Sequence, residues 1–118
     1  MPETARSPDA WVVSAYEVPL HENPMLRGRW ARILDESARG LIVAAGRLAP
    51  GEDSGWHDHP EDEVFIVLDG RGVVRWRLDD AEHEYSVSPG SLFYKKGGIS
   101  HAMRAADDGE LIGIGCKV

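Results

Sequence analysis

The sequence has little cysteine, little positive charge and no long apolar run. Cys116 is the only cysteine in 118 residues, so an internal disulfide is excluded, and we expect a protein of the reducing cytoplasm. No apolar stretch approaches the roughly 20 residues of a membrane-spanning helix, and the N-terminus lacks the basic start and apolar stretch of a secretory signal. Lys and Arg number 13 against 20 Asp and Glu, with no basic stripe. These absences argue against a membrane partner and a nucleic-acid partner.

Sustained helical periodicity is also missing, and short runs of β-forming residues take its place. Turn signals separate these runs at intervals of about ten residues, which is typical of an all-β domain. We expect one domain over residues 11–118, a small barrel or double-sheet jelly roll, after a mobile tail over residues 1–10. Asp69-Gly70 predicts a tight turn between two strands, and Asp79-Asp80 another. The expected strands cover residues 11–15, 26–34, 41–48, 64–68, 73–78, 84–87, 92–94, 100–104 and 110–118.

Two histidines and a glutamate in one segment predict part of a metal site. His57 and His59 stand two residues apart, so in an extended backbone their imidazoles project from the same face and can reach one ion. Pro60 favours a break in pairing, after which Glu63 opens an apolar strand with a carboxylate at its mouth. This nitrogen and oxygen set suits one divalent transition metal ion, such as iron, manganese, nickel, zinc or copper. A fourth ligand is needed.

A later segment repeats the order of turn, short strand, glycine turn and histidine, and ends at His101. His101 and Glu63 are far apart in the sequence, so they meet only if the intervening strands return the chain to the same face of a barrel. We predict that His101 supplies the fourth ligand. By the alternation of side chains along a strand, the residues expected to point inward with these ligands are Phe65, Val67 and Met103.

The first segment resembles a known family. Five residues separate Gly51 from His57, one separates His57 from His59, three precede Glu63 and six precede Gly70. This spacing is similar to that of the first motif of the cupin superfamily, which is the more specific of its two motifs. The resemblance implies a jelly-roll β-barrel in which the two histidines and the glutamate hold a metal ion.

The second segment resembles the second cupin motif, with Gly90, Gly98 and His101 in the expected places. It departs from the family pattern at two positions, because Lys96 stands where the family has proline and Ala105 where it has asparagine. Neither is a ligand position, so the expected metal site is unaffected. The resemblance covers roughly residues 40–105.

Bulky residues can line a pocket above the ion, although packing is their commoner role in a barrel. Tyr94 is the one whose hydroxyl could also donate to a bound substrate or act as an acid, so we predict it as the catalytic residue. Lys95 and Lys96 are typical of an exposed turn, and a role in attracting an anionic substrate is the alternative. The other bulky candidates are Trp56, Trp76, Phe65 and Met103.

The remaining polar residues near the motifs have less specific roles. Asp58, Glu61 and Asp62 are expected to solvate a loop or to accept hydrogen bonds from the imidazole ligands. His21 and His83 lie in polar surroundings, so we expect both at the solvated surface.

Four ligands leave one or two positions of an octahedral ion open, and open positions distinguish a catalytic site from a structural one. The cupins, which this sequence resembles, include dioxygenases, decarboxylases, isomerases, lyases and non-catalytic sensors. The fold alone therefore does not determine the reaction. Our first hypothesis is a metal-dependent enzyme for a small anionic organic substrate, with an oxygenase as the leading reaction class. A ligand-binding sensor and a metal-stabilised structural domain are the alternatives.

The expected strand 64–68 is apolar on both faces, because Val64, Ile66 and Leu68 alternate with the inward residues. Such a strand is expected to be buried on both sides, either by a second sheet or by a second subunit. We therefore predict a homodimer, the commonest symmetric assembly.

Overall fold

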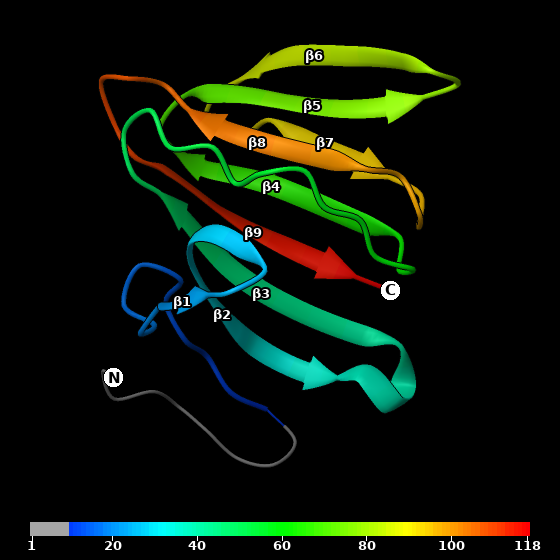
Figure 1. Ribbon diagram of the computed structural model, residues 1–118. Coiled ribbons are helices and arrows are strands. Elements are labelled where there is room, and N and C mark those ends of the chain that lie inside the picture. The colour runs from blue at the N-terminus through cyan, green and yellow to red at the C-terminus, as the bar shows by residue number, and fades with distance from the viewer. Residues whose placement is uncertain (1–9) are drawn as a thin grey trace.

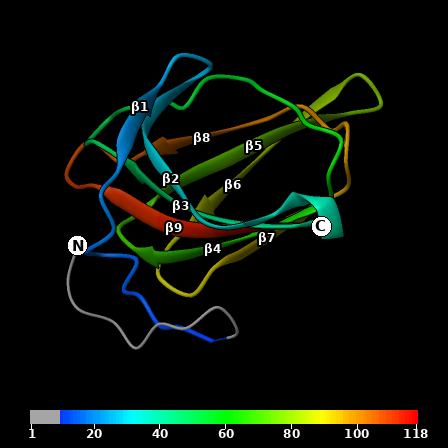
Figure 2. The same cartoon turned by 90° about the horizontal axis from the view of Figure 1, so that it is seen from below.

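The computed structural model describes residues 10–118, in which nine strands form two antiparallel sheets (Figure 1). Figure 2 shows β8, β5 and β6 on one side of the interior and β9, β4 and β7 on the other. The larger sheet has the order β1 (His21–Asn23), β2 (Leu26–Glu36), β3 (Leu41–Leu48), β9 (Leu111–Lys117), β4 (Glu63–Asp69), β7 (Leu92–Lys95). The smaller sheet has the order β6 (Ala81–Val87), β5 (Gly72–Leu78), β8 (His101–Ala105).

The all-β, double-sheet architecture confirms the predicted fold class. A one-turn 3-10 helix, η1 (Ser37–Arg39), joins β2 to β3, and Gly40 ends it in the left-handed region at φ 78°. Among residues 10–118, no helix has the length and apolar composition needed to cross a membrane. The expected mobile tail lies outside the described residues except for Ala10.

Most of the expected strands occur within one to three residues of their predicted bounds. The expected strand at residues 11–15 is wrong, because only an isolated bridge forms there, at Trp11. The turn at Asp79-Asp80 is confirmed: both residues have positive φ, 52° and 62°, and they connect β5 and β6 as a two-residue hairpin.

The dipeptide Asp69-Gly70 does not close a hairpin, because it leads from β4 in the larger sheet to β5 in the smaller one. Gly70 has φ 85°, and a Cβ atom there would lie 1.8 Å from the carbonyl oxygen of Glu110. Glycine is therefore required by a close approach between segments at this crossing, in addition to its backbone conformation.

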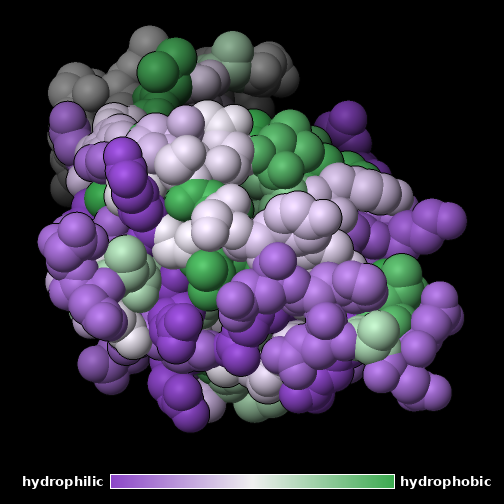
Figure 3. Space-filling view, turned by 90° about the horizontal axis from the view of Figure 1, so that it is seen from above, coloured by the Kyte–Doolittle hydropathy of each residue, from purple (hydrophilic) through white to green (hydrophobic). Residues whose placement is uncertain are grey.

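The interior between the sheets is apolar and follows the alternation predicted from the sequence. Phe65 and Val67 of β4 are 5% and 2% exposed, and Met103 of β8 is 5% exposed, as expected. The buried cluster consists of Leu48, Phe65, Val67, Val74, Val87, Met103, Ala105 and Leu111. Figure 3, which views the molecule from the β6 side, shows mostly hydrophilic side chains on that surface and a smaller hydrophobic area. The polar residues of the site lie at one end of this apolar interior.

Candidate metal centre

The two motifs are joined by backbone pairing. The segment that precedes β4 runs along β8, where the His57 N–H donates to the His101 carbonyl (3.0 Å) and the His101 N–H donates to the His57 carbonyl (2.9 Å). The Gly98 N–H donates to the His59 carbonyl (2.8 Å), so the glycine turn of the second motif is fixed to the first. Residues far apart in the sequence are thus held at one end of the barrel.

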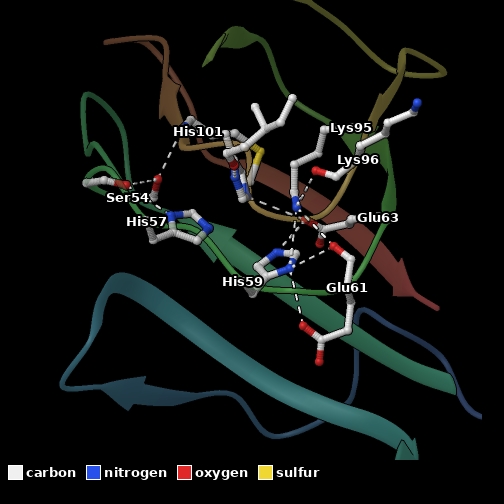
Figure 4. Close-up of polar contacts among 11 residues, drawn as sticks. Ser54, His57, His59, Glu61, Glu63, Lys95, Lys96 and His101 are labelled. Atoms are coloured by element: carbon white, nitrogen blue, oxygen red, sulfur yellow. Dashed lines mark hydrogen bonds and ion pairs between the residues drawn. The ribbon is translucent and has the colours of Figure 1, made fainter. Parts of the chain in front are cut away.

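The structure brings together all four residues predicted as ligands (Figure 4). One ring nitrogen from each of His57, His59 and His101 lies within 4.8 Å of the others. Oε1 of Glu63 lies 3.1 Å from Nε2 of His59 and 3.5 Å from Nε2 of His101. The four side chains converge from the loop before β4, from the first residue of β4 and from the first residue of β8.

Each imidazole has its Nδ1 atom against a backbone carbonyl. The Nδ1 atoms of His57, His59 and His101 lie 3.1, 3.2 and 3.0 Å from the carbonyl oxygens of Gly55, Glu61 and Ile99. A carbonyl oxygen only accepts, so these contacts favour a proton on Nδ1 and leave the lone pair on Nε2. Metal-bound histidines in proteins are oriented by contacts of this kind.

This arrangement fits a cation. With the proton on Nδ1, the Nε2 lone pairs of His59 and His101 face a carboxylate oxygen, and neither partner has a hydrogen to donate. A positive centre among them, either a metal ion or a proton on Nε2, resolves the conflict. Three imidazole nitrogens and one carboxylate oxygen are the donor types that zinc and other transition metals accept in proteins.

The protonation states also suit a metal ligand set. Burial, and then the neighbouring His101, lowers the pKa of His57 from 6.5 to about 4, so this imidazole is neutral at pH 7. Burial acts to raise the pKa of Glu63, but hydrogen bonds from His101 and His59, which donate when Nε2 carries a proton, outweigh that effect and hold the pKa of this carboxyl well below its usual range. A neutral imidazole and an ionised carboxylate are the forms that bind metal.

Glu63 is buried, at 9% exposure, and β9 makes room for it. A Cβ atom on Gly115 would lie 2.6 Å from Oε2 of Glu63, and one on Gly113 would lie 2.3 Å from the ring of Phe65. The absence of side chains at these two β9 positions therefore lets the inward residues of β4 occupy the interior. Sequence reasoning missed this role, because the register between β4 and β9 shows only in the fold.

Lys95 is also part of the site, although the sequence suggested an exposed turn. It pairs with Glu63 across β4 and β7, is 3% exposed, and places Nζ 3.4 Å from Nδ1 of His59. Nζ donates to the carbonyl oxygens of Glu61 (3.3 Å) and Lys96 (3.5 Å), and burial lowers the pKa of Lys95. Lys96 is exposed, and its amine extends away from the cluster (Figure 4). The prediction for Lys95 was wrong, and that for Lys96 is confirmed.

Tyr94 does not belong to this site. It pairs with Val64 on the outer face of the larger sheet and is 53% exposed, whereas its neighbour Lys95 points inward. A catalytic role for the Tyr94 hydroxyl at the histidine cluster is therefore contradicted by the alternation of side chains along β7. Trp56 also lies elsewhere, against the guanidinium groups of Arg75 and Arg77.

The acidic residues of the loop before β4 differ in role. Glu61 accepts from the His59 imidazole through its carbonyl oxygen, and its carboxylate Oε1 lies 3.5 Å from the same Nδ1 atom. Asp62 accepts from the Gly97 N–H (2.8 Å), which connects the loops of the two motifs, and Asp58 is exposed. Glu61 is thus the one acidic residue of the three that contacts an imidazole.

Comparison with known proteins finds a matching family and a relative. The family description "Cupin domain" matches residues 45–114. The β-alanine degradation protein BauB of Pseudomonas aeruginosa is 24% identical over 78 residues, which are 66% of this chain and 81% of that protein.

Solved structures share the fold. A predicted oxalate decarboxylase from Thermotoga maritima superimposes with a TM-score of 0.75 at 22% identity, over 91% of this chain and 97% of that chain. A structure of DMSP lyases superimposes with a TM-score of 0.65 at 26% identity, over 77% of this chain but 47% of that chain. Together with the family match over more than half of the sequence, these likenesses show that the chain belongs to the cupin domain family.

Proposed function

We propose that the protein is a metal-dependent enzyme that acts on a small organic anion, with His57, His59, Glu63 and His101 holding the ion. The observation that carries this proposal is the orientation of the three imidazoles. Their Nδ1 atoms are committed to backbone carbonyls, and two of the Nε2 atoms face an ionised carboxylate. A proton or a metal ion can fill that place, and the donor set favours the metal.

The charge of the site favours an anionic substrate. A bound divalent ion would bring two positive charges and Glu63 would offset one, which would leave a net positive charge in a largely buried place. The amine of Lys95, behind His59, adds to the positive character. Because buried charge is costly unless it is paired, a carboxylate or enolate oxygen is a better ligand here than a neutral group.

Bound to these residues, a metal ion would supply Lewis-acid chemistry at a substrate oxygen or, in the case of iron, dioxygen chemistry. The residues of the chain orient the imidazole ligands and shield the cluster from water. The carbonyls of Gly55, Glu61 and Ile99 fix the imidazole rings, and the loop contacts of Asp62 and Lys95 hold the ligand segment in place. The apolar core beneath the cluster, including Phe65 and Met103, excludes water from its inner side.

An oxygenase is the first reaction class to test. The purified protein is loaded separately with iron(II), manganese(II), nickel(II) and zinc(II) and supplied with a panel of small organic acids, while dioxygen uptake and products are measured together. We expect metal-dependent turnover that is lost in His101→Ala and kept in Tyr94→Phe, because Tyr94 lies on the outer face. Stoichiometric metal binding and substrate affinity without product would contradict an enzyme and favour a sensor.

A second candidate is a lyase or decarboxylase that needs no dioxygen. It is favoured by the structural likeness to a predicted oxalate decarboxylase and to DMSP lyases. The same assay separates the two classes, since a lyase or decarboxylase forms product under argon whereas an oxygenase does not.

A further inference from the structure

Aromatic side chains gather beside the histidine cluster on the inner faces of β5, β6 and β7. Trp76 of β5 pairs with His101 on one side and with His83 of β6 on the other, so all three residues lie on one face of the smaller sheet. Val74, which is 2% exposed, pairs with Tyr85 in the same way, which identifies this face as the inner one. Tyr85 and His83 therefore point toward the interior side, although β6 is an edge strand.

The rings are aligned. The indole of Trp76 is nearly parallel to the Tyr85 ring (centroids 5.6 Å apart, 10° between planes) and to the His83 ring (5.4 Å, 20°). Phe93 of β7 approaches Trp76 from the opposite sheet at 5.4 Å and lies 6.3 Å from the His101 ring. We call Trp76, His83, Tyr85 and Phe93 the aromatic wall.

A hollow opens beside this wall where the edge strands β6 and β7 face each other without pairing. It has a volume of about 400 Å³, within the size of small-molecule pockets. Residues of β5, β6 and β7 line it, among them Trp76, Tyr85 and Phe93. Although it faces inward, Tyr85 is 66% exposed, so the core leaves much of its ring uncovered.

From this geometry we infer that the aromatic wall is a recognition subsite for a planar conjugated ring, so that the substrate is a small aromatic or similarly conjugated organic acid. This inference rests on the proposed function, because the acidic group of the substrate is expected at the metal ligands. The flat, nearly parallel faces of Trp76 and Tyr85 suit stacking against a planar group, which a saturated ring of the same size cannot match.

The aromatic wall and the histidine cluster are neighbours in the fold, through the contacts of Trp76 and Phe93 with His101. Trp76 and His101 are directly opposite in neighbouring strands, where Cβ atoms lie about 4.5–5.5 Å apart. Phe93 lines the hollow, and its ring centroid lies 6.3 Å from that of His101. A ring against the wall, with its carboxylate directed toward His101, would approach the cluster on the side where a bound divalent ion would leave a net positive charge.

Benzoate and cyclohexanecarboxylate test this inference by calorimetry on the zinc-loaded protein, because the two probes share their charge and ring size but only benzoate is planar. We expect benzoate to bind about three- to tenfold more tightly, the size of an aromatic contact beyond its buried area. Equal affinities, or no benzoate binding at millimolar concentration, would overturn the inference.

Two variants test whether the aromatic wall causes the preference for benzoate. Tyr85→Leu and Trp76→Leu are expected to remove the preference for benzoate while zinc content stays unchanged. Tyr94→Leu is the matched control, since Tyr94 is exposed to a similar extent, 53% against 66%, but lies on the outer face. A preference that survives in both wall variants would place the ring elsewhere and contradict the inference.

Oxalate, a dianion without a ring, separates this inference from the proposed function. Zinc retention and oxalate binding without a preference for benzoate would contradict the aromatic subsite alone. Failure of the unmodified protein to retain zinc, iron(II), manganese(II) or nickel(II) would contradict the proposed metal enzyme, and with it the subsite.

Discussion

Each imidazole of the centre is held by its own backbone carbonyl, so the ligands are oriented independently of one another. Removing one side chain should therefore delete one metal bond and leave the other donors in place. We expect His59→Ala to lower the metal content severalfold on elemental analysis, because a direct ligand is lost. His83→Ala, an exposed histidine outside the cluster, should retain full metal content. Full retention by His59→Ala would show that the site is misassigned.

The negative charge of Glu63 is expected to contribute to metal affinity, in addition to the position of its side chain. Glu63→Gln keeps the shape of the side chain but leaves a neutral amide against His59 and His101. We expect metal affinity to fall by about tenfold or more, since an ionised oxygen ligand is replaced by a neutral one. Competition with a chelator of known affinity measures this change, and an unchanged affinity would contradict a ligand role for the carboxylate.

Single residues also show how far sequence reasoning reaches. The four predicted ligands meet because their spacing and the strand alternation constrain them strongly. Tyr94 was predicted to face the pocket and Lys95 to lie in an exposed turn, and both predictions were wrong. The sequence of β7 has apolar side chains on both faces, so only the pairing of Lys95 with Glu63 shows which face is buried. A polar residue next to an aromatic one carries no signal of which side is buried.

At the scale of elements, β9 supports the site because it has glycine, without a side chain, next to Glu63. Gly115→Ala would bring a Cβ atom to 2.6 Å from Oε2 of Glu63, which is the flexible end of a side chain and can move. We expect the fold to persist and metal affinity to fall about tenfold, the effect typical of disturbing a ligand's support. Gly109→Ala is the matched control, since a Cβ atom at that position would have nothing within 4 Å of it. Unchanged affinity in Gly115→Ala would contradict the proposed support by β9.

Elements were easier to predict than their assembly. Local sequence patterns identified most strands and the hairpin at Asp79-Asp80, because turn chemistry and strand alternation act over a few residues. Asp69-Gly70 has similar local chemistry but connects the two sheets, and there Gly70 lies against the backbone of the distant residue Glu110. Which sheet a strand joins depends on contacts between residues far apart in the sequence, and a short stretch of sequence does not reveal these contacts.

At the scale of the whole molecule, the metal-free protein should lose stability in acid. The pKa of His57 falls from 6.5 to about 4 on folding, so between these values the unfolded chain binds a proton that the folded chain does not. The free energy of unfolding is therefore expected to decrease as the pH falls from about 6.5 to about 4. Glu63, whose pKa is lowered by folding, adds to the loss below its ordinary value of 4.5.

Urea unfolding of chelator-treated protein at several pH values measures this dependence. His57→Gln should show a smaller decrease over the same range, because it cannot take up the proton. Equal pH dependence in the two proteins would show that His57 is not buried in its neutral form.

Exposed apolar side chains on the outer face of β4 and β7 predict that two copies of the protein associate. Ile66 and Leu92 are paired across these strands and are 39% and 61% exposed, and Tyr94 beside them is 53% exposed. Covering these apolar side chains is favourable, so we expect a homodimer by light scattering at micromolar concentration and a monomer in Ile66→Lys. A monomeric unmodified protein would remove this expectation.

The most direct test of the metal centre is anomalous diffraction from crystals of the protein loaded with zinc or manganese, collected at the metal absorption edge. We predict one peak about 2.0–2.3 Å from the Nε2 atoms of His57, His59 and His101 and from a carboxylate oxygen of Glu63. A fully loaded crystal with no peak among these four side chains, or with the ion bound elsewhere, would contradict the account.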